Sequence, residues 1–313
     1  FTPARRDDRL RATWTGGSGA LIVGFVGRLA PEKHVERLAS LAHDPTVQLV
    51  VVGDGPGAGE KALRIVTRLR NLLAKQGADP AVVLDADLRP EGRSGPMVRN
   101  LKSYRKYYGK WSSTWESQAL LRASHGAGDR ELTTELLGCL DAVRYPADGL
   151  TGSQLAEIRK LKARMESERI PRGVDPRRHL KLGPGGLSDI EWTAQVIQLQ
   201  HAGDEPALRT TSTIKALDAA LAAGYIDGEQ HAELCDSWLA ASRLRNAIMM
   251  VRGRPSDVIP SDSTDLDVIA RALGMGRGAS EHLIEDHLRH CRRASRAVDA
   301  VFWNQIGRAS CRE

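Results

Sequence analysis

Lys181-Leu-Gly-Pro-Gly-Gly-Leu-Ser-Asp-Ile-Glu-Trp192 is a glycine-rich stretch that opens a helix, expected over 187–202. Its glycines allow the backbone to approach either a phosphate or a neighbouring segment of chain closely; they are Gly183, Gly185 and Gly186. Asp189 and Glu191 lie in the first turn, where acids interact favourably with the positive end of the helix dipole. On the residues alone, a phosphate loop and an ordinary glycine-rich helix start are equally good interpretations.

Helical periodicity extends from this stretch in both directions. Apolar residues recur three and four positions apart, and Pro- and Gly-rich joints separate several segments, notably at 171–186 and 253–260. The sequence predicts helices near 101–124, 128–141, 151–169, 187–202, 210–224, 228–252, 264–273 and 279–303. His287 and His290 lie among arginines, and we expect them on a solvated face of the last helix.

The first 57 residues have a different pattern. Two short apolar runs, at 20–26 and 47–52, are bounded by glycines and predict buried strands, with an amphipathic helix between them at 31–43. Strand, helix and strand in this length form one βαβ unit of a parallel sheet. The predicted fold class is therefore mainly α, with a partial α/β piece at the N-terminus followed by a helical bundle.

Composition and charge exclude several classes of protein. The chain has 313 residues, 41% hydrophobic and 27% charged, which is typical of a globular protein. Its longest apolar runs are too short to cross a bilayer, and no basic-then-apolar leader opens the sequence. The four cysteines form no Cys-x-x-Cys pair and fit the reducing cytoplasm. The net charge of +6 comes without a basic block interleaved with aromatics, so neither nucleic acid nor membrane is an expected partner.

Leu84-Asp85-Ala-Asp87-Leu-Arg89 holds the main candidate for chemistry. Carboxylates two residues apart on a strand point to the same face, and Mg²⁺ prefers such oxygen ligands together with phosphates. A strand that ends in solvated acids is the competing interpretation. Asp265-Leu-Asp267 has the same spacing, but no apolar strand carries it, so we expect a helix start with acids in its first turn.

Gly27-Arg28-Leu-Ala-Pro-Glu-Lys33 follows a predicted strand and opens a predicted helix. Backbone amides there, with Arg28 and Lys33, could cradle a diphosphate, although an ordinary turn with exposed charges is the simpler reading. The amino-acid sequence of residues 1–56 resembles the donor-binding Rossmann domain of retaining GT-B glycosyltransferases. That resemblance implies that Arg28 and Lys33 hold the diphosphate of a nucleotide-sugar, but the family's later acidic motif is not found in this sequence.

Several longer phrases occur in the order of a second family. They are Trp115-Glu-Ser-Gln-Ala-Leu-Leu-Arg122, Ile158-Arg-Lys-Leu-Lys-Ala-Arg164, the stretch 181–192, Ser242-Arg-Leu-Arg-Asn246 and Val251-Arg-Gly-Arg-Pro255. Residues from about 60 to 303 resemble glutamine synthetase adenylyltransferase, most closely the C-terminal, adenylylating half of the actinobacterial type. The resemblance implies a DNA polymerase beta-like nucleotidyltransferase domain followed by a helical domain. It also implies transfer of AMP from ATP to a tyrosine of glutamine synthetase, with Mg²⁺ and under control of a PII signal protein, and phosphorolytic removal of AMP by a paired half.

The same resemblance implies roles for individual residues. Asp85 falls at the third metal-site carboxylate, where it would bind Mg²⁺ and activate the attacking tyrosine hydroxyl. Nucleotide or phosphate contacts are implied for Arg89, Arg122 and Lys181. Supporting roles are expected for Asp87, Glu116, Asp189 and Glu191.

The upstream half of that nucleotidyltransferase domain, with its strand carrying two further carboxylates, is not found in this sequence. The expected parts are a glycosyltransferase-like βαβ fragment (1–57), a truncated nucleotidyltransferase domain with a remnant of its sheet (58–123), a helical bundle (124–303) and a non-native tail (304–313). We therefore expect an incomplete, weak or inactive catalyst. Two alternatives stay open, namely a nucleotide-sugar-dependent glycosyltransferase fragment and a non-catalytic helical module that docks on glutamine synthetase or PII.

Overall fold

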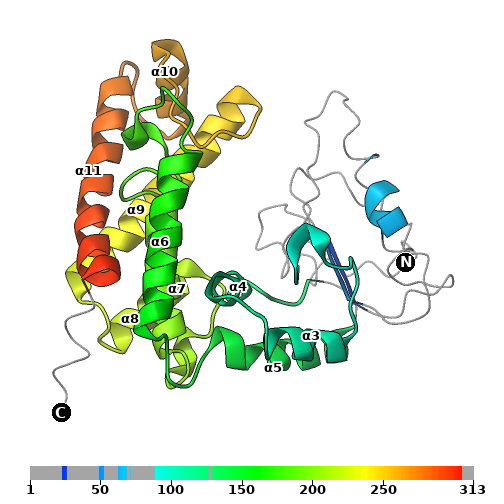
Figure 1. Cartoon of the computed structure of the whole chain (residues 1–313). Coiled ribbons are helices and arrows are strands. Elements are labelled where there is room, and N and C mark those ends of the chain that lie inside the picture. Colours follow the sequence, from blue (N-terminus) through cyan, green and yellow to red (C-terminus); the bar gives the residue numbers. More distant parts are fainter. Residues whose placement is uncertain are drawn as a thin grey trace, which may run out of the picture. The chain divides into compact units, whose positions relative to one another are not determined.

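The computed structural model describes residues 23–26, 49–52, 63–68, 71, 89–126 and 129–304; for 23–26, 49–52 and Arg93 only the backbone is described. The chain divides into two compact units, whose course is drawn in Figure 1. The first unit holds the described residues up to Ser112 together with Ser124–Leu140. The second holds Ser113–Ala123 and the described residues from Asp141 onward.

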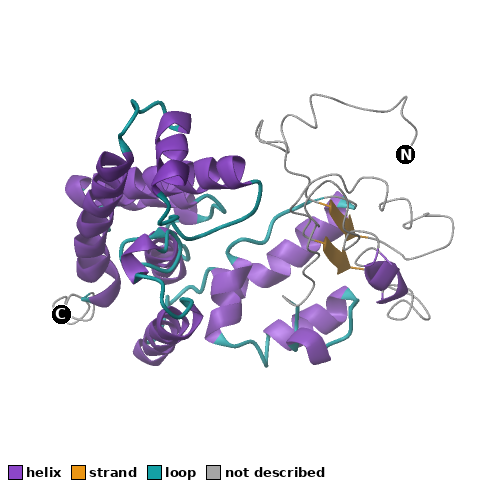
Figure 2. Ribbon diagram, turned by 90° about the horizontal axis from the view of Figure 1, so that it is seen from above, coloured by secondary structure: helices purple, strands orange, loops and turns teal. Residues whose placement is uncertain are grey.

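Two short strands lie in the first unit. Strands β1 (Val23–Val26) and β2 (Leu49–Val52) pair in parallel, with Val23 opposite Leu49 and Val26 opposite Val52; both are orange in Figure 2. The helix expected at 31–43 and the strand-like run at 81–88 lie outside the described residues. The complete βαβ unit and the remnant of a nucleotidyltransferase sheet therefore stay predictions.

The single helix predicted over 101–124 is wrong, because the chain forms two helices there. Helix α3 (Leu101–Tyr108) begins at Asn100, whose side chain accepts from Ser103 N, and ends at Gly109. Helix α4 (Thr114–Leu120) begins after Ser113. Glu116 accepts from both Ser113 N and Ser113 Oγ, at 2.8 and 3.2 Å. Glu116 is the third residue of the helix, and Ser113 is the residue before it. Hydrogen bonds from Ser113 to the glutamate side chain are one half of a capping box, a motif that starts a new helix.

The second unit is a bundle of helices, which confirms the mainly helical class. Besides α4 and the end of α5 (Arg130–Arg144), it contains α6 (Gly152–Arg169), α7 (Leu187–His201), α8 (Thr213–Ala222), α9 (Gly228–Arg252), α10 (Ser263–Ala272), α11 (Ser280–Val298) and a π-helix (Asp299–Trp303). The six helices predicted within 151–303 are confirmed to within a few residues at most ends. Among the described residues, none of the helices combines the length and apolar character that crossing a bilayer needs.

Helix α7 lies at the centre of this bundle. From Leu187 to Leu199, every residue except Glu191 and Trp192 is buried, and a helix buried on nearly all sides belongs in a core. Its apolar side chains pack in one cluster with residues of α6, α8, α9 and the π-helix, among them Ile158, Leu217, Leu234 and Phe302. A second cluster joins α9, α10 and α11. Polar groups on α7 are satisfied inside the core: Gln118 Nε2 donates to Gln195 Oε1 at 2.7 Å.

Helix α10 carries the acid pair that has the spacing of a metal site. Asp262 accepts from Asp265 N at 2.9 Å and so caps the helix. Asp265 pairs with Arg252 at 3.3 Å, and Asp267 pairs with Arg271 at 3.2 Å. The interpretation of this segment as a helix start is confirmed.

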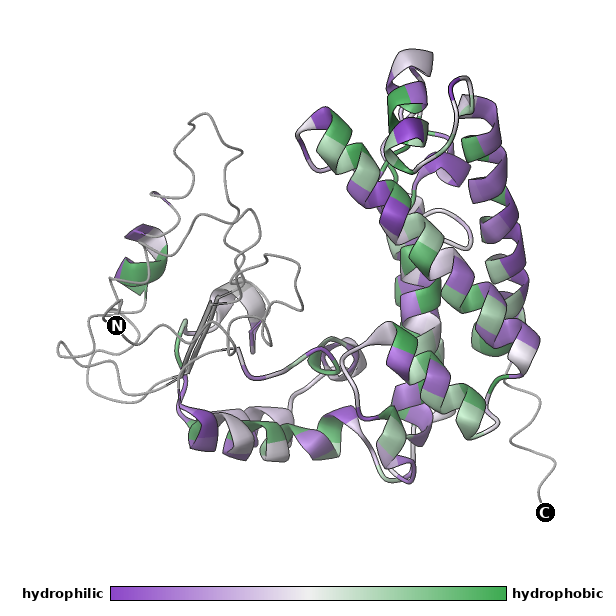
Figure 3. Ribbon diagram, turned by 180° about the vertical axis from the view of Figure 1, so that it is seen from behind, coloured by the Kyte–Doolittle hydropathy of each residue, from purple (hydrophilic) through white to green (hydrophobic). Residues whose placement is uncertain are grey.

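Helix α11 packs most extensively against α9 and is amphipathic. Its buried stripe consists of Leu283, His287, Cys291, Ala294, Ala297 and Val298. The arginines of α11 are exposed, and Figure 3 colours most of this helix as hydrophilic. The expected exposure of His287 is wrong, because it lies four residues after Leu283 and four before Cys291, on the core side. His290, on an adjacent face, is half-buried.

We predict that His287 makes folding stability depend on pH. Burial lowers the pKa of its imidazole from 6.5 to about 4. Between these values the unfolded chain binds a proton that the folded chain does not, so the contribution is complete above about pH 6.5 and is lost toward pH 4. A shift of this size corresponds to roughly 3 kcal/mol. We expect His287→Gln to remove much of this pH dependence in urea unfolding measured from pH 7 to pH 4.

The matched control is His290→Gln on the same helix, which should keep the slope of the parent chain. Equal pH slopes for the parent and His287→Gln would contradict the assignment.

Candidate functional site

The residues singled out from the sequence fall into three groups. Asp85, Asp87, Arg28 and Lys33 lie outside the described residues. Arg89 lies in the first unit. The second unit contains Glu116, Arg122, Lys181, Asp189 and Glu191.

Arg89 closes a compact loop. Its Nε donates to Gly95 O at 3.2 Å, across a short 3-10 turn at Gly92–Ser94. Within the loop, Glu91 has a left-handed backbone (φ 64°) and pairs with Arg99 at 2.6 Å. The guanidinium of Arg89 thus takes part in the structure of its own loop, and its contact with a phosphate stays a prediction.

Arg122 and Glu191 come from two different phrases and meet in an ion pair. Arg122 Nε donates to Glu191 Oε1 at 3.0 Å, and Nη2 bonds to the same oxygen. The guanidinium also donates to Thr211 O and, at 3.2 Å, to Thr213 Oγ1. One side chain therefore joins the end of α4 to the N-terminal part of α7 and the start of α8.

Asp189 is buried in the first turn of α7 and meets a buried ammonium from α6. Lys162 Nζ contacts Asp189 Oδ1 and Glu166 Oε1. The other oxygen, Asp189 Oδ2, accepts from Gly185 N at 2.6 Å. Burial raises the pKa of Glu166, while Lys162 opposes that rise. Asp189 thus binds a cation with one oxygen and the glycine-rich loop with the other.

The glycine-rich stretch packs against protein backbone. Gly186 is the residue that precedes α7, and Gly185 is left-handed with φ 67°. A Cβ on Gly185 would lie 2.1 Å from Cys291 O on α11. Ser237 on α9 donates to Gly185 O at 3.1 Å. Of the two interpretations of this stretch, the structure shows a helix start pressed against a neighbouring segment of chain.

Lys181 lies at the exposed beginning of the same stretch. Its backbone carbonyl accepts from Ser188 N at 2.8 Å, which fastens the loop to the first turn of α7. The neighbouring His179 is buried, and burial lowers the pKa of its imidazole. The fold therefore holds the backbone of Lys181 in place. Its side chain is exposed, and a role for its ammonium in binding an anion stays a prediction.

Sequence reasoning missed two buried cations on α6. Arg159 and Lys162 are only 8% and 2% exposed. Arg159 Nε donates to Phe302 O at 2.9 Å, at the end of the last helix, where a cation also interacts favourably with the helix dipole. The available signal is spacing, because both cations fall on the core-facing stripe that begins with Leu155 and Ile158. In these contacts carboxylates or a carbonyl hold the cations, which suits positioning of helices rather than proton transfer.

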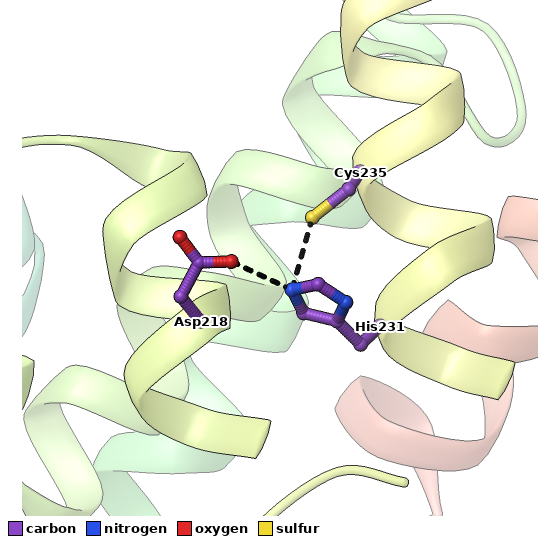
Figure 4. Close-up of side chains that lie close together, drawn as sticks. All are labelled: Asp218, His231 and Cys235. Carbon is purple, nitrogen blue, oxygen red and sulfur yellow. Dashed lines mark hydrogen bonds and ion pairs between the residues drawn. The ribbon is translucent and has the colours of Figure 1, made fainter. Parts of the chain in front are cut away.

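Only one group of potential metal ligands lies together among the described residues. It consists of Asp218, His231 and Cys235, drawn in Figure 4. Mg²⁺ prefers oxygen ligands in octahedral geometry, so a group with an imidazole and a thiol does not suit it. The Mg²⁺ site implied by the resemblance is therefore not supplied by the described residues.

Two family models match the chain. Residues 41–139 match a model for glutamate-ammonia ligase adenylyltransferase, and residues 156–305 match a model for GlnD PII-uridylyltransferase. The match to the adenylyltransferase model begins at residue 41, inside the stretch 1–56 whose sequence resembles a glycosyltransferase donor domain.

Curated relatives are similar over most of this chain. A bifunctional glutamine synthetase adenylyltransferase/adenylyl-removing enzyme of Cutibacterium acnes is 90% identical over 257 residues, which is 82% of this chain and 26% of the relative. Enzymes of the same name from Streptomyces avermitilis and Mycobacterium tuberculosis are 52% and 48% identical, over 80% and 76% of this chain and 25% and 24% of the relatives. The chain thus spans about a quarter of the length of these relatives.

We predict that Gly185→Ala destabilises the second unit by at least about 3 kcal/mol, because a left-handed backbone disfavours a Cβ and the added atom meets the α11 backbone. Gly228→Ala is the control, since a Cβ there has nothing within 4 Å. Thermal or urea unfolding of both variants measures the difference. Equal stability of Gly185→Ala and the parent chain would contradict the close contact between Gly185 and the backbone of α11.

We predict that Lys162→Met costs about 3–5 kcal/mol of stability, because Asp189 loses its buried cation. Lys160→Met on the exposed side of the same helix should change stability by less than about 0.5 kcal/mol. Adding Asp189→Asn to Lys162→Met should recover part of the loss, because no unpaired buried charge then remains. A double variant as unstable as the sum of the two single variants would show that the two side chains are not coupled.

Proposed function

We propose that this chain, most of which is a segment of the glutamine synthetase adenylyltransferase family, contributes to transfer of AMP from ATP to a tyrosine of glutamine synthetase. The observation that carries the proposal is the 90% identity over 257 residues to the bifunctional enzyme of Cutibacterium acnes. The match of 41–139 to the family model for glutamate-ammonia ligase adenylyltransferase agrees with it.

The proposed reaction is a nucleotidyl transfer that regulates nitrogen assimilation. The tyrosine hydroxyl oxygen attacks the α-phosphorus of ATP, the bond to pyrophosphate breaks, and the hydroxyl proton passes to a carboxylate. Positioning and charge neutralisation provide most of the catalysis in reactions of this type. The names of the relatives also include removal of the adenylyl group, which we propose occurs by phosphorolysis in a paired half.

Asp85 is the proposed base and Mg²⁺ ligand, with support from Asp87. Both lie outside the described residues, so this assignment rests on their spacing and on the family resemblance. Mg²⁺ would neutralise charge on the phosphates. We propose Arg89 and Lys181 as the further phosphate contacts.

The remaining candidates are better suited to positioning than to contact with substrate. Glu116 starts α4, and Asp189 holds both Lys162 and the glycine-rich loop. Arg122 is engaged by Glu191 and by two threonines, so a phosphate would have to compete with a carboxylate for it. We therefore propose that Arg122 and Glu191 hold α4, α7 and α8 in place, although the family resemblance points to a phosphate contact for Arg122.

Partners and domains follow the same reasoning. We propose glutamine synthetase as the protein substrate and a PII signal protein as a regulator, the latter supported by the match of 156–305 to a PII-uridylyltransferase model. We also propose that the protein is located in the cytoplasm, together with these partners. We also propose an N-terminal α/β piece that contains β1 and β2, and domain boundaries after 57 and 123.

We predict that this chain alone modifies glutamine synthetase at least about 10²-fold more slowly than the Cutibacterium acnes enzyme, because Asp85 lacks the two partner carboxylates of the metal site. Replacing the matching segment of that enzyme with this chain's 113–303 should restore the rate to within about 10-fold. Mass spectrometry of glutamine synthetase after incubation with ATP and Mg²⁺ measures the AMP adduct. A folded but inactive chimaera would contradict the proposed function, and rapid modification by this chain alone would contradict the incomplete metal site.

A further inference from the structure

Three side chains of different donor types meet between α8 and α9. Asp218 comes from α8, while His231 and Cys235 lie four residues apart on α9 and therefore share one face of that helix. His231 Nε2 lies 2.8 Å from Asp218 Oδ1 and 3.5 Å from Cys235 Sγ. The three atoms all lie within 4.8 Å of one another, and Figure 4 shows the three side chains turned toward one another.

This arrangement is not a catalytic relay. In a relay of nucleophile, histidine and acid, the acid holds one ring nitrogen and the nucleophile contacts the other. Here the carboxylate and the thiol both approach Nε2. Burial, with Asp218 and Asp236 acting in the same direction, raises the pKa of the Cys235 thiol to about 11, whereas a reactive cysteine has a lowered pKa.

The shared nitrogen is instead the arrangement that a metal requires. A metal bound to a histidine lies along the lone pair of its ring nitrogen, and the Asp218 and Cys235 donors both lie next to that nitrogen. Zn²⁺ binds sulfur at about 2.3 Å and nitrogen or oxygen at about 2.0–2.2 Å, in a tetrahedron. Those bond lengths place neighbouring donors about 3.3–3.8 Å apart, a range that includes the distance from Nε2 to Sγ.

The carboxylate is free to make the remaining adjustment. Asp218 Oδ1 has to move away from Nε2 by about 0.5 Å to reach tetrahedral spacing. Its side chain is 56% exposed, so the movement meets little packing, and it opens a path for the ion and for a water. Cys235 is buried and His231 is partly buried, so two of the three ligands are held firmly by the core.

We propose that Asp218, His231 and Cys235 form a three-ligand site for Zn²⁺ or a similar divalent transition metal, with water as the fourth ligand. Metal–sulfur, metal–nitrogen and metal–oxygen bonds form as water ligands leave the hydrated ion. The thiol proton passes to the solvent, and the neutral imidazole carries its proton on Nδ1, so that the lone pair of Nε2 is available to the metal. The bound ion links α8 to α9 and takes no part in the proposed adenylyl transfer.

Titration of the full chain with Co²⁺ tests this site. We expect one equivalent of Co²⁺ to produce a thiolate-to-metal charge-transfer band in the near ultraviolet, and one equivalent of Zn²⁺ to abolish it. Cys235→Ser should lose the band, whereas Cys139→Ser, which changes a cysteine of the first unit, should keep it. Absence of the band in the parent chain, or its persistence in Cys235→Ser, overturns the proposal.

Asp218→Asn tests the site without altering a buried side chain. We expect it to weaken Co²⁺ binding by at least about 10-fold, because a ligand is lost while the packing is unchanged. The control is Asp286→Asn, which changes an acid paired with His282 at 3.3 Å on α11, where the pair has no thiol. Equal Co²⁺ affinity of Asp218→Asn and the parent chain overturns the role of the carboxylate and with it the three-ligand site.

Discussion

A buried ammonium determines how the helical unit closes. Lys162 is removed from water on α6, and the desolvation of such a charge costs several kcal/mol unless carboxylates compensate it closely. Asp189 and Glu166 provide that compensation. Because Asp189 also accepts from Gly185 N, the position of the cation is linked to the start of α7 and to the backbone contact between the glycine-rich loop and α11. Three helices are thus held by one charge and its partners.

The phrases that carry the family resemblance supply these same contacts. The phrase 158–164 contains Lys162, and 181–192 contains Asp189 and Glu191. Arg122, from a third phrase, completes the connection to α4 and α8. What looks in the sequence like a set of site motifs is, in the second unit, largely a polar framework that fixes helix ends. The proposed chemistry at the phosphates is assigned to residues nearer the N-terminus, above all Asp85, which lies outside the described residues.

Periodicity sufficed for the helices of the bundle, because Pro- and Gly-rich joints divide it and each segment has its own buried stripe. It failed at 109–113, where no proline interrupts the pattern and a glutamate returning to Ser113 decides the break. His287 was misplaced because its charged neighbours outweighed its spacing from Leu283. The sequence does not predict the group around His231, because its third member, Asp218, lies on another helix. Only the packing of α8 against α9 brings Asp218 near. The structure gives no distances for the proposed magnesium ligands, because Asp85 and Asp87 lie outside the described residues.

The bond between Arg159 and Phe302 joins groups 143 residues apart and has a consequence for biosynthesis. A guanidinium can leave water only when an acceptor replaces its hydration. During translation α6 leaves the ribosome long before the carbonyl of Phe302 exists, so the guanidinium of Arg159 stays hydrated until the last helix has been made. The helical unit therefore acquires its final packing late, after most of its secondary structure is already available.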